Sequence, residues 1–242
     1  MELKILITIC ARGGSKGIPG KNIKLLNNKP LIAYTIESAQ KFAASVNGTV
    51  ILSTDSDQIK EAAANFGLET EYVRPDDLAN DTAGKVAVIK HAMDYLEEKT
   101  GRHFDIMLDM DVTSPLRTQS DLDQGLDKLM NNENALNIFS VNPASRNPYF
   151  NMVEEDADGF VTLSKPPKTP IYSRQTAPKV YDMNASFYFY KRAFFEQGFT
   201  TPIIPNQSLI YVMPHVCFDL DEPLDFEFME YLLSYNKLTF EI

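Results

Sequence analysis

The segment most suited to chemistry lies at residues 11–22 and reads ARGGSKGIPGKN. Its four glycines allow backbone N–H groups to approach an anion closely. Arg12, Lys16 and Lys21 add positive charge, which suits a triphosphate. The segment directly follows an unbroken apolar run at residues 4–10. We therefore predict an anion-binding loop after the first strand.

This loop differs from two common nucleotide-binding motifs. A Walker A loop would require Gly at position 15 and Ser or Thr at position 22, where Ser15 and Asn22 stand, and the spacing G-x-G-x-x-G does not fit either. Charge gives separate support, because residues 5–36 contain no Asp or Glu. The average acid frequency of the chain predicts about four acids in a stretch of that length. A chance distribution of charge in a surface loop is the alternative interpretation.

Two Asp-x-Asp pairs are candidates for metal binding. Asp219 and Asp221 occupy alternate positions of a segment expected to be extended, and both carboxylates could face one Mg²⁺, which takes oxygen ligands and substrate phosphates. Asp109 and Asp111, separated by Met110, lie at the end of a predicted strand. A carboxylate so near bound phosphates would need a cation beside it. Acids that only solubilise a strand end or cap a turn are the alternative.

Histidine and cysteine offer no further catalytic group. His91, His103 and His215 have no ligand spacing with another His or Cys, which argues against a zinc site. Cys10 and Cys217 lie in predicted strands without a neighbouring His, so we expect both in the core. The sequence suggests no covalent catalysis.

Strands and helices are expected to alternate from residue 4 to residue 141. Apolar runs predict strands at 4–10, 49–54, 69–73, 104–110 and 135–141, and apolar residues at helical spacing predict helices at 30–45, 56–66, from 81 or 82 to 99, and 120–131. A strand at 185–191, extended pieces at 209–214 and 218–221, and a helix at 223–235 follow. This order favours a Rossmann-like α/β fold with a mostly parallel sheet and helices on both faces.

Residues 142–180 interrupt this alternation. They hold six of the fourteen prolines and have short extended pieces but no apolar core of their own. A plain loop of about forty residues would be unusual in a compact domain. We therefore predict one α/β domain over residues 1–242, with 142–180 as an extended insertion that a partner subunit completes. A long surface loop is the alternative.

Composition argues against several classes of protein. The chain has 242 residues and a formal net charge of -10, which disfavours a nucleic-acid-binding surface. No run approaches the roughly 18 apolar residues of a membrane span, and no signal-peptide pattern is seen. Because two cysteines cannot form a disulfide framework, we expect a reducing compartment, the cytoplasm.

Ordered motifs spread over residues 5–226 resemble the acylneuraminate cytidylyltransferases (CMP-sialic acid synthetases), which use CTP and Mg²⁺. The matching positions after the loop at 11–22 are Ser53-Thr-Asp55, Asp81-Thr82, Thr113-Ser-Pro-Leu-Arg117, Tyr172-Ser-Arg174-Gln175, Asn184 and Asp219-Leu-Asp221-Glu-Pro-Leu-Asp225. The resemblance implies a nucleotidyltransferase that moves CMP from CTP to the anomeric hydroxyl of an N-acylneuraminate and releases pyrophosphate.

The resemblance also implies roles on the nucleotide side. Arg12, Lys16 and Lys21 would hold the triphosphate and, with Asp221, form the catalytic set. Asp219 and Asp221 would bind Mg²⁺, or Mn²⁺ in its place, with Asp111 as a further candidate ligand. Thr82 is equally a candidate helix cap. The implied nucleotide-binding residues are Ala11, Arg12, Gly13, Gly14, Ser15, Lys21, Asn22, Arg74 and Thr82.

On the sugar side the resemblance implies Asp111, Arg174, Gln175 and Tyr188. Arg174 and Gln175 would reach the site of the other subunit in a homodimer built on 142–180, where a guanidinium can bind the sugar carboxylate through two hydrogen bonds. Tyr188 could instead be a core aromatic.

Two departures from the family pattern leave the sugar open. Asp111 stands where many members have Gln, and no Lys lies near residues 149–151, where the family often has one. The same reaction on legionaminate, pseudaminate or deaminated neuraminate is therefore the alternative. Two more distant alternatives are a nucleotide-sugar-binding protein without turnover and a glycosyltransferase that uses its Asp-x-Asp motifs.

Overall fold

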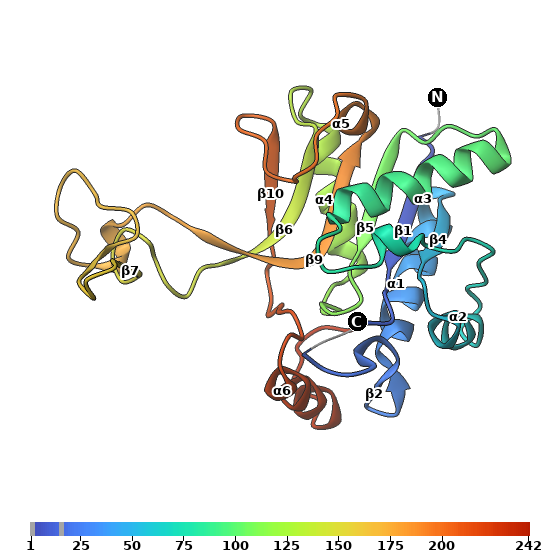
Figure 1. Cartoon of the computed structure of the whole chain (residues 1–242), viewed down its shortest axis with the longest axis horizontal. Coiled ribbons are helices and arrows are strands. Elements are labelled where there is room, and N and C mark those ends of the chain that lie inside the picture. The colour runs from blue at the N-terminus through green and yellow to red at the C-terminus, as the bar shows by residue number, and fades with distance from the viewer. Residues whose placement is uncertain (1–2, 15–16) are drawn as a thin grey trace.

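The computed structural model describes residues 3–14 and 17–242. Within them, the central sheet is built from β1 (Ile5–Cys10), β4 (Thr49–Ser53), β5 (Ile106–Met110), β6 (Asn137–Pro143), β9 (Tyr181–Lys191) and β10 (Ser208–Val212). The strand order is β10-β6-β9-β5-β1-β4 (Figure 1). Only β9 in this sheet runs against its neighbours, β5 and β6. The predicted mostly parallel sheet is thus confirmed.

Helices cover both faces of this sheet (Figure 1). One face packs α1, α2, α4 and α6 against side chains such as Ile7 and Phe189, and the other packs α3 and α5 against Leu6 and Tyr190. This alternation along single strands is the period of two expected where both faces are buried. The bounds are α1 (Leu31–Val46), α2 (Asp57–Ala64), α3 (Lys85–Thr100), α4 (Gln119–Met130), α5 (Arg192–Glu196) and α6 (Pro223–Ser234).

Smaller elements lie in the connections. They are β2 (Leu25–Leu26) and β3 (Lys29–Pro30), which pair with each other, and the 3₁₀ turns η1 (Lys21–Ile23), η2 (Asp76–Leu78) and η3 (Arg174–Thr176). No helix among the described residues is long and apolar enough to cross a lipid bilayer.

Two predicted strands are wrong. Residues 69–73 run beside β4 but make isolated bonds instead of a ladder: Thr70 Oγ1 donates to the carbonyl oxygen of Leu52 at 3.2 Å, and the N–H of Arg74 donates to that of Thr54 at 3.0 Å. Residues 218–221, predicted as an extended piece, form no strand either. There the N–H of Leu220 donates to the carbonyl oxygen of Thr113 at 2.9 Å, which ties the segment to the loop after β5.

The start of α3 also differs from the prediction. The helix begins at Lys85 with Gly84 as its N-cap, so neither Asp81 nor Thr82 caps it. Asn80 Oδ1 accepts hydrogen bonds from the N–H and Oγ1 of Thr82 and from the N–H of Ala83. A side chain that binds the backbone just ahead of it holds that backbone in a turn, which delays the helix.

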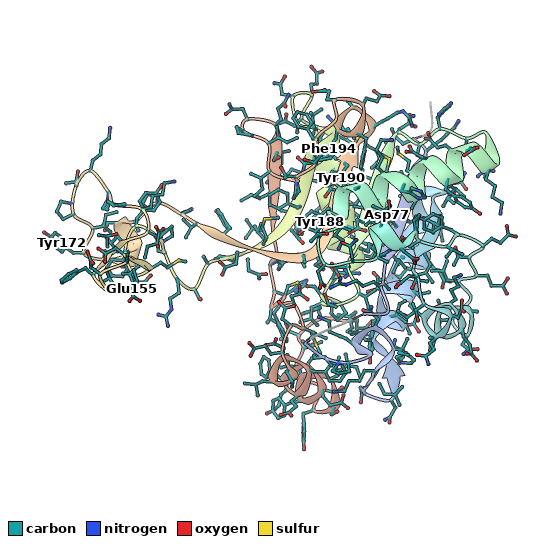
Figure 2. All side chains as sticks on the ribbon, in the orientation of Figure 1. Asp77, Glu155, Tyr172, Tyr188, Tyr190 and Phe194 are labelled. Atoms are coloured by element: carbon teal, nitrogen blue, oxygen red, sulfur yellow. The ribbon has the colours of Figure 1, made fainter. Side chains whose placement is uncertain are left out.

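The segment between β6 and β9 projects from the sheet as a long arm (Figure 1). Its hairpin pairs β7 (Val153–Glu155) with β8 (Val161–Leu163). Figure 2 shows Glu155 and Tyr172 far from the sheet. Apolar side chains of the arm are open to solvent, with Phe160 72% and Tyr172 87% exposed. The arm therefore lacks an apolar core of its own, as expected.

Both ends of the arm leave the sheet side by side. Asn142 on β6 pairs with Asp182 on β9, and the register between these strands shifts between Phe139 and Val141. Ala185 on β9 has a φ of 58°, a left-handed conformation that side chains other than glycine seldom adopt. The regular ladder is therefore interrupted where β9 enters the sheet.

Candidate active site

A cleft lies beyond the carboxyl ends of β1 and β5, where ligands bind in open α/β sheets. It contains a cavity of about 290 Å³ and an adjoining one of about 260 Å³, which share Cys10, Arg12 and Asp111. The first is also lined by Gly17, Lys21, Asn22, Thr113 and Asp221, and the second by Arg74, Leu78, Asn80, Asp81, Ala83, Lys85 and Val88. Four of the predicted nucleotide residues, Arg12, Lys21, Asn22 and Arg74, thus line this cleft.

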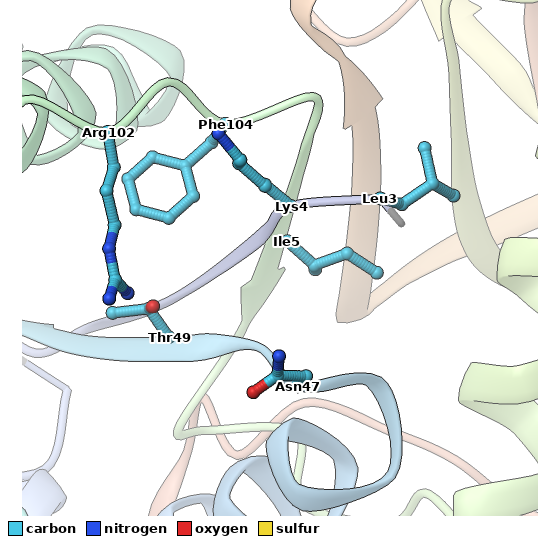
Figure 3. A pocket seen from close by; sticks show the side chains of 7 residues that line it. All are labelled: Leu3, Lys4, Ile5, Asn47, Thr49, Arg102 and Phe104. Atoms are coloured by element: carbon cyan, nitrogen blue, oxygen red, sulfur yellow. The ribbon is translucent and has the colours of Figure 1, made fainter. Parts of the chain in front are cut away.

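A hollow of about 330 Å³ lies at the opposite end of the sheet (Figure 3). It surrounds the amino end of β1, and Lys4, Thr49 and Arg102 are among its lining residues. It contains none of the predicted site residues, so its larger size does not make it the better candidate.

The loop after β1 is held by side chains from neighbouring connections. The N–H of Gly13 donates to Asp55 Oδ1 at 2.8 Å, and Asn22 Nδ2 donates to the carbonyl oxygen of Arg12 at 2.9 Å. Arg12 Nη2 lies 2.6 Å from Asp81 Oδ1. Asn22 is therefore a support of this loop. The predicted residues Ser15 and Lys16 lie outside the described part of the chain.

Lys21 joins the loop to the segment that carries the second predicted aspartate pair. Its Nζ donates to the carbonyl oxygen of Leu220 at 2.5 Å and lies 3.7 Å from Asp221 Oδ1. Gly17 touches the same segment, because a Cβ at this position would lie 2.4 Å from the carbonyl oxygen of Asp221. The predicted anion loop and the predicted metal segment are thus in direct contact.

Arg74 and Thr82 are placed differently from the other predicted nucleotide residues. Arg74 is buried and donates through Nε to Ser53 Oγ at 3.0 Å and through Nη2 to the carbonyl oxygen of Ser53 at 2.6 Å. The guanidinium is thus hydrogen-bonded to β4, and Arg74 also lines the cleft. Thr82 is exposed in the turn held by Asn80.

Asp219 has a carboxylate oxygen, Oδ1, that is buried without a hydrogen-bond partner among residues 3–14 and 17–242. Burial raises the pKa of this carboxyl, and the nearby carboxylates of Asp111 and Asp221 raise it further. A buried, unpaired oxygen among like charges is a place where a cation would be favourable.

These donors suit a hard cation that also binds phosphates. Asp219 and Asp221 offer carboxylate oxygens next to the loop predicted to hold the triphosphate. Among residues 3–14 and 17–242, no three His, Cys, Asp or Glu side chains form a ready-made metal cage. The donor set therefore fits Mg²⁺ bound partly by the substrate.

Lys85 is a site residue that the sequence did not reveal. Its Nζ lies 2.9 Å from Asp109 Oδ2 and also donates to Asp111 Oδ2. Burial alone would lower the pKa of this ammonium, but the charges of Asp109 and Asp111 raise it well above its ordinary value. Burial would likewise raise the pKa of Asp111, but Lys85 lowers it. The cation expected beside Asp111 is thus supplied by the protein.

Arg117 holds the turn after β5 in place through hydrogen bonds. This buried guanidinium donates through Nη2 to the carbonyl oxygens of Asp111 and Ser114, and through Nε to Ser186 Oγ at 2.9 Å. Burial lowers its pKa to about 10. Since its hydrogen-bond partners are carbonyl and hydroxyl oxygens, Arg117 positions backbone and does not itself reach the cleft.

The sequence comparisons agree with this architecture. A family model described as cytidylyltransferase matches residues 6–237. The chain belongs to the cytidylyltransferase family. It is 39% identical over 235 residues to the post-translational flagellin modification protein B of Campylobacter coli, covering 97% of each chain. It is 38% identical over 236 residues to the CMP-N,N'-diacetyllegionaminic acid synthase of Campylobacter jejuni, covering 98% of this chain and 97% of that one. The resemblance noted from the motifs is confirmed.

More distant matches extend the comparison. The N-acylneuraminate cytidylyltransferase of Escherichia coli is 28% identical, and the match covers 94% of this chain and 51% of that one. A solved structure of CMP:2-keto-3-deoxy-manno-octonic acid synthetase complexed with CTP has a TM-score of 0.63 at 17% identity, with 96% and 99% of the two chains covered. That likeness shows the fold.

The predicted sugar-side residues of this cytidylyltransferase fall in two places. Tyr188 is buried on β9, with Lys85 Nζ 5.8 Å from its ring centroid, and burial raises its pKa to about 12. Figure 2 shows it beside Tyr190 in the core of the sheet. Gln175 belongs to η3, as does Arg174, and lines a separate cavity at the base of the arm. Gln175 therefore does not line the cleft of its own chain.

Proposed function

We propose that this cytidylyltransferase transfers CMP from CTP to the anomeric hydroxyl of a nonulosonic acid and releases pyrophosphate. The observation that carries the proposal is the single cavity in which Arg12 and Lys21 face Asp111 and Asp221. Positive side chains suit the triphosphate there, and the carboxylate of Asp221 suits a bridging cation.

Relatives support more than one acceptor sugar. The higher identity to a diacetyllegionaminic acid synthase favours a legionaminate-type acceptor over N-acetylneuraminate. Pseudaminic acid is a further candidate, because a pseudaminic acid cytidylyltransferase of Campylobacter jejuni is 32% identical over 241 residues.

The proposed reaction is an in-line attack of the sugar hydroxyl on the α-phosphorus. Arg12 exchanges Asp81 for phosphate oxygens, and Lys21, with Lys16, neutralises the leaving pyrophosphate. Asp219 and Asp221 would hold Mg²⁺, or Mn²⁺, which when bound polarises the α-phosphate. The protein mainly positions the reactants, with the loop after β1 fixing the nucleotide.

The sugar side of the proposal requires a homodimer. Arg174 and Gln175 would bind the sugar in the cleft of the other subunit. The exposed apolar side chains of the arm support this arrangement, because a second subunit would cover them. Tyr188 would then pack beneath the sugar pocket as part of its wall.

A pyrophosphate-release assay tests the function. The chain is incubated with CTP, Mg²⁺ and, in turn, N-acetylneuraminate, legionaminate, pseudaminate and deaminated neuraminate. We expect release that depends on both CTP and one of these sugars, fastest with the diacetylated legionaminate. The absence of release with every sugar and every nucleoside triphosphate would refute the enzyme proposal.

A further inference from the structure

Lys85 occupies a position that its own helix disfavours. It is the first residue of α3, and the N-cap Gly84 offers no side-chain cap. A helix N-terminus carries partial positive charge, so an ammonium there is repelled. A residue that opposes its local environment is expected to be compensated elsewhere and often serves function.

Two aspartates compensate this charge. Asp109 is fully buried, and its Oδ1 accepts a hydrogen bond from Thr8 Oγ1 at 2.9 Å while its Oδ2 lies 2.9 Å from Lys85 Nζ. Asp111 Oδ2 binds the same ammonium, and its Oδ1 accepts from the N–H and Oγ1 of Thr113, both at 3.1 Å. Three oxygens of this pair accept hydrogen bonds from the protein, and the fourth, Asp109 Oδ2, accepts none from the described residues but lies 2.9 Å from the Lys85 ammonium.

The other Asp-x-Asp pair is in the opposite condition. Asp219 Oδ1 meets no donor in the described part of the chain, and the side chain of Asp221 is 76% exposed at the cleft. The Nζ of Lys21 lies 3.7 Å from Asp221 Oδ1. Its closer contact is the hydrogen bond that it donates to the carbonyl oxygen of Leu220. Each pair thus has one nearby lysine for two carboxylates, but Lys85 contacts both carboxylates of the first pair, whereas Lys21 lies 3.7 Å from Asp221 at the second.

We propose that the Lys85 ammonium takes the place of a second metal ion at Asp109 and Asp111, so that the site binds one divalent cation, through Asp219 and Asp221. A second divalent ion near Asp111 would face a full positive charge within contact distance of the same carboxylate, which is strongly unfavourable. This inference rests on the proposed function and removes Asp111 from the candidate metal ligands. The side chain of Asp111 then remains a candidate contact for the sugar.

Counting bound Mn²⁺ by electron paramagnetic resonance tests the inference. The full chain is mixed with an equal amount of α,β-methylene-CTP, which cannot react, and titrated with Mn²⁺. We expect one ion per chain in the wild type and in Lys90→Ala, a control on the same helix whose lysine is 48% exposed and pairs with Asp94. Lys85→Ala should bind two. Two ions in the wild type, or one in Lys85→Ala, would overturn the proposal.

A second pair of variants keeps Lys85 and so avoids an unpaired buried aspartate. Asp111→Asn should leave the Mn²⁺ Kd within about twofold, whereas Asp221→Asn should raise it at least about tenfold. Equal weakening by both would assign Asp111 to the metal and end the proposal. The outcome is separable from the function, because pyrophosphate release together with two bound ions refutes only the role of Lys85.

Discussion

The four aspartates of the cleft have the same chemistry but different surroundings. Asp109 and Asp111 share the Lys85 ammonium, Asp219 has a buried Oδ1 beside like charges, and Asp221 faces solvent. Environment therefore separates a structural pair from a pair that can accept a cation.

Asp221→Ala should lower kcat by at least about 100-fold, because it removes a proposed metal ligand at the reacting phosphate. Since the side chain is 76% exposed, the fold should persist, with a thermal midpoint within about 3 °C of the wild type. Pyrophosphate release and circular dichroism measure the two effects. Asp127→Ala, on the exposed face of α4, is the matched control. Unchanged kcat in Asp221→Ala would contradict the assigned role.

Gly17→Ala should impair nucleotide binding without touching any charged group. The added methyl would lie 2.4 Å from the carbonyl oxygen of Asp221, so the loop or the metal segment must move. We expect the KM for CTP to rise about tenfold or more. Gly14→Ala is the control in the same loop, because a Cβ there meets no atom of the described residues within 4 Å. Equal kinetics in the two variants would show that the contact is unimportant.

The sequence predicted some of the residues at the cleft but not all of them. The glycine-rich loop indicated Arg12, Lys21 and Asn22, because several cations and glycines in one turn have few other uses. Lys85 gave no such signal, because it is one lysine on an amphipathic helix. Its contact with Asp109 and Asp111 depends on where α3 starts relative to the end of β5, and this is a feature of the tertiary structure.

Elements place these residues through the ends of strands and helices. The loops after β1, β4 and β5 meet at one edge because those strands are parallel neighbours. Hydrophobic periodicity was enough to predict most of them. It failed at 69–73, where an extended chain lies beside β4 without a ladder, and at the start of α3, where Asn80 holds a turn. Both errors arise from side-chain hydrogen bonds that periodicity does not encode.

The C-terminal half of α3 is anchored by an ion pair whose strength depends on pH. Glu97 Oε1 lies 2.6 Å from Arg192 Nη1, at the start of α5. Burial raises the pKa of Glu97, but the hydrogen bonds from Arg192 and the N–H of Phe104 outweigh it, so the pKa is lowered. A lowered folded-state pKa contributes stability above the unfolded value, and this stability is lost as the pH falls through the folded one.

Glu97→Gln should therefore cost about 2 kcal/mol of unfolding free energy at pH 7. The difference from the wild type should shrink as the pH falls below about 4. Urea denaturation at several pH values measures it, with the exposed Glu98→Gln as the control. A difference that stays constant down to pH 3 would contradict the ion pair as its cause.

Over the whole molecule, a compact sheet carries a long arm with no core. The fold class was predictable from the alternation of strands and helices. Proline content and the missing apolar pattern marked the insertion at 142–180. The direction in which the arm points could not be predicted, because it depends on the bend of β9 near Ala185.

Mixing two inactive variants tests whether the arm serves another subunit. Asp221→Ala lacks a proposed metal ligand, and Arg174→Ala lacks a proposed sugar contact from the arm. In a heterodimer one cleft keeps Asp221 and receives an intact arm, so equal mixing should restore about a quarter of the wild-type rate. Sedimentation should show dimers before and after mixing. An active monomer, or no recovery in verified heterodimers, would refute the shared site.

The arm leaves and re-enters the sheet through strands that pair with each other, Asn142 opposite Asp182 and Pro143 opposite Tyr181. Its two ends are thus fixed next to each other whatever lies between them. Loop-closure entropy grows slowly with length, so lengthening or shortening the arm disturbs the sheet little. The arm is therefore free to diverge during evolution faster than the nucleotide cleft, and a change of acceptor sugar or of partner can arise there while the CTP chemistry stays intact.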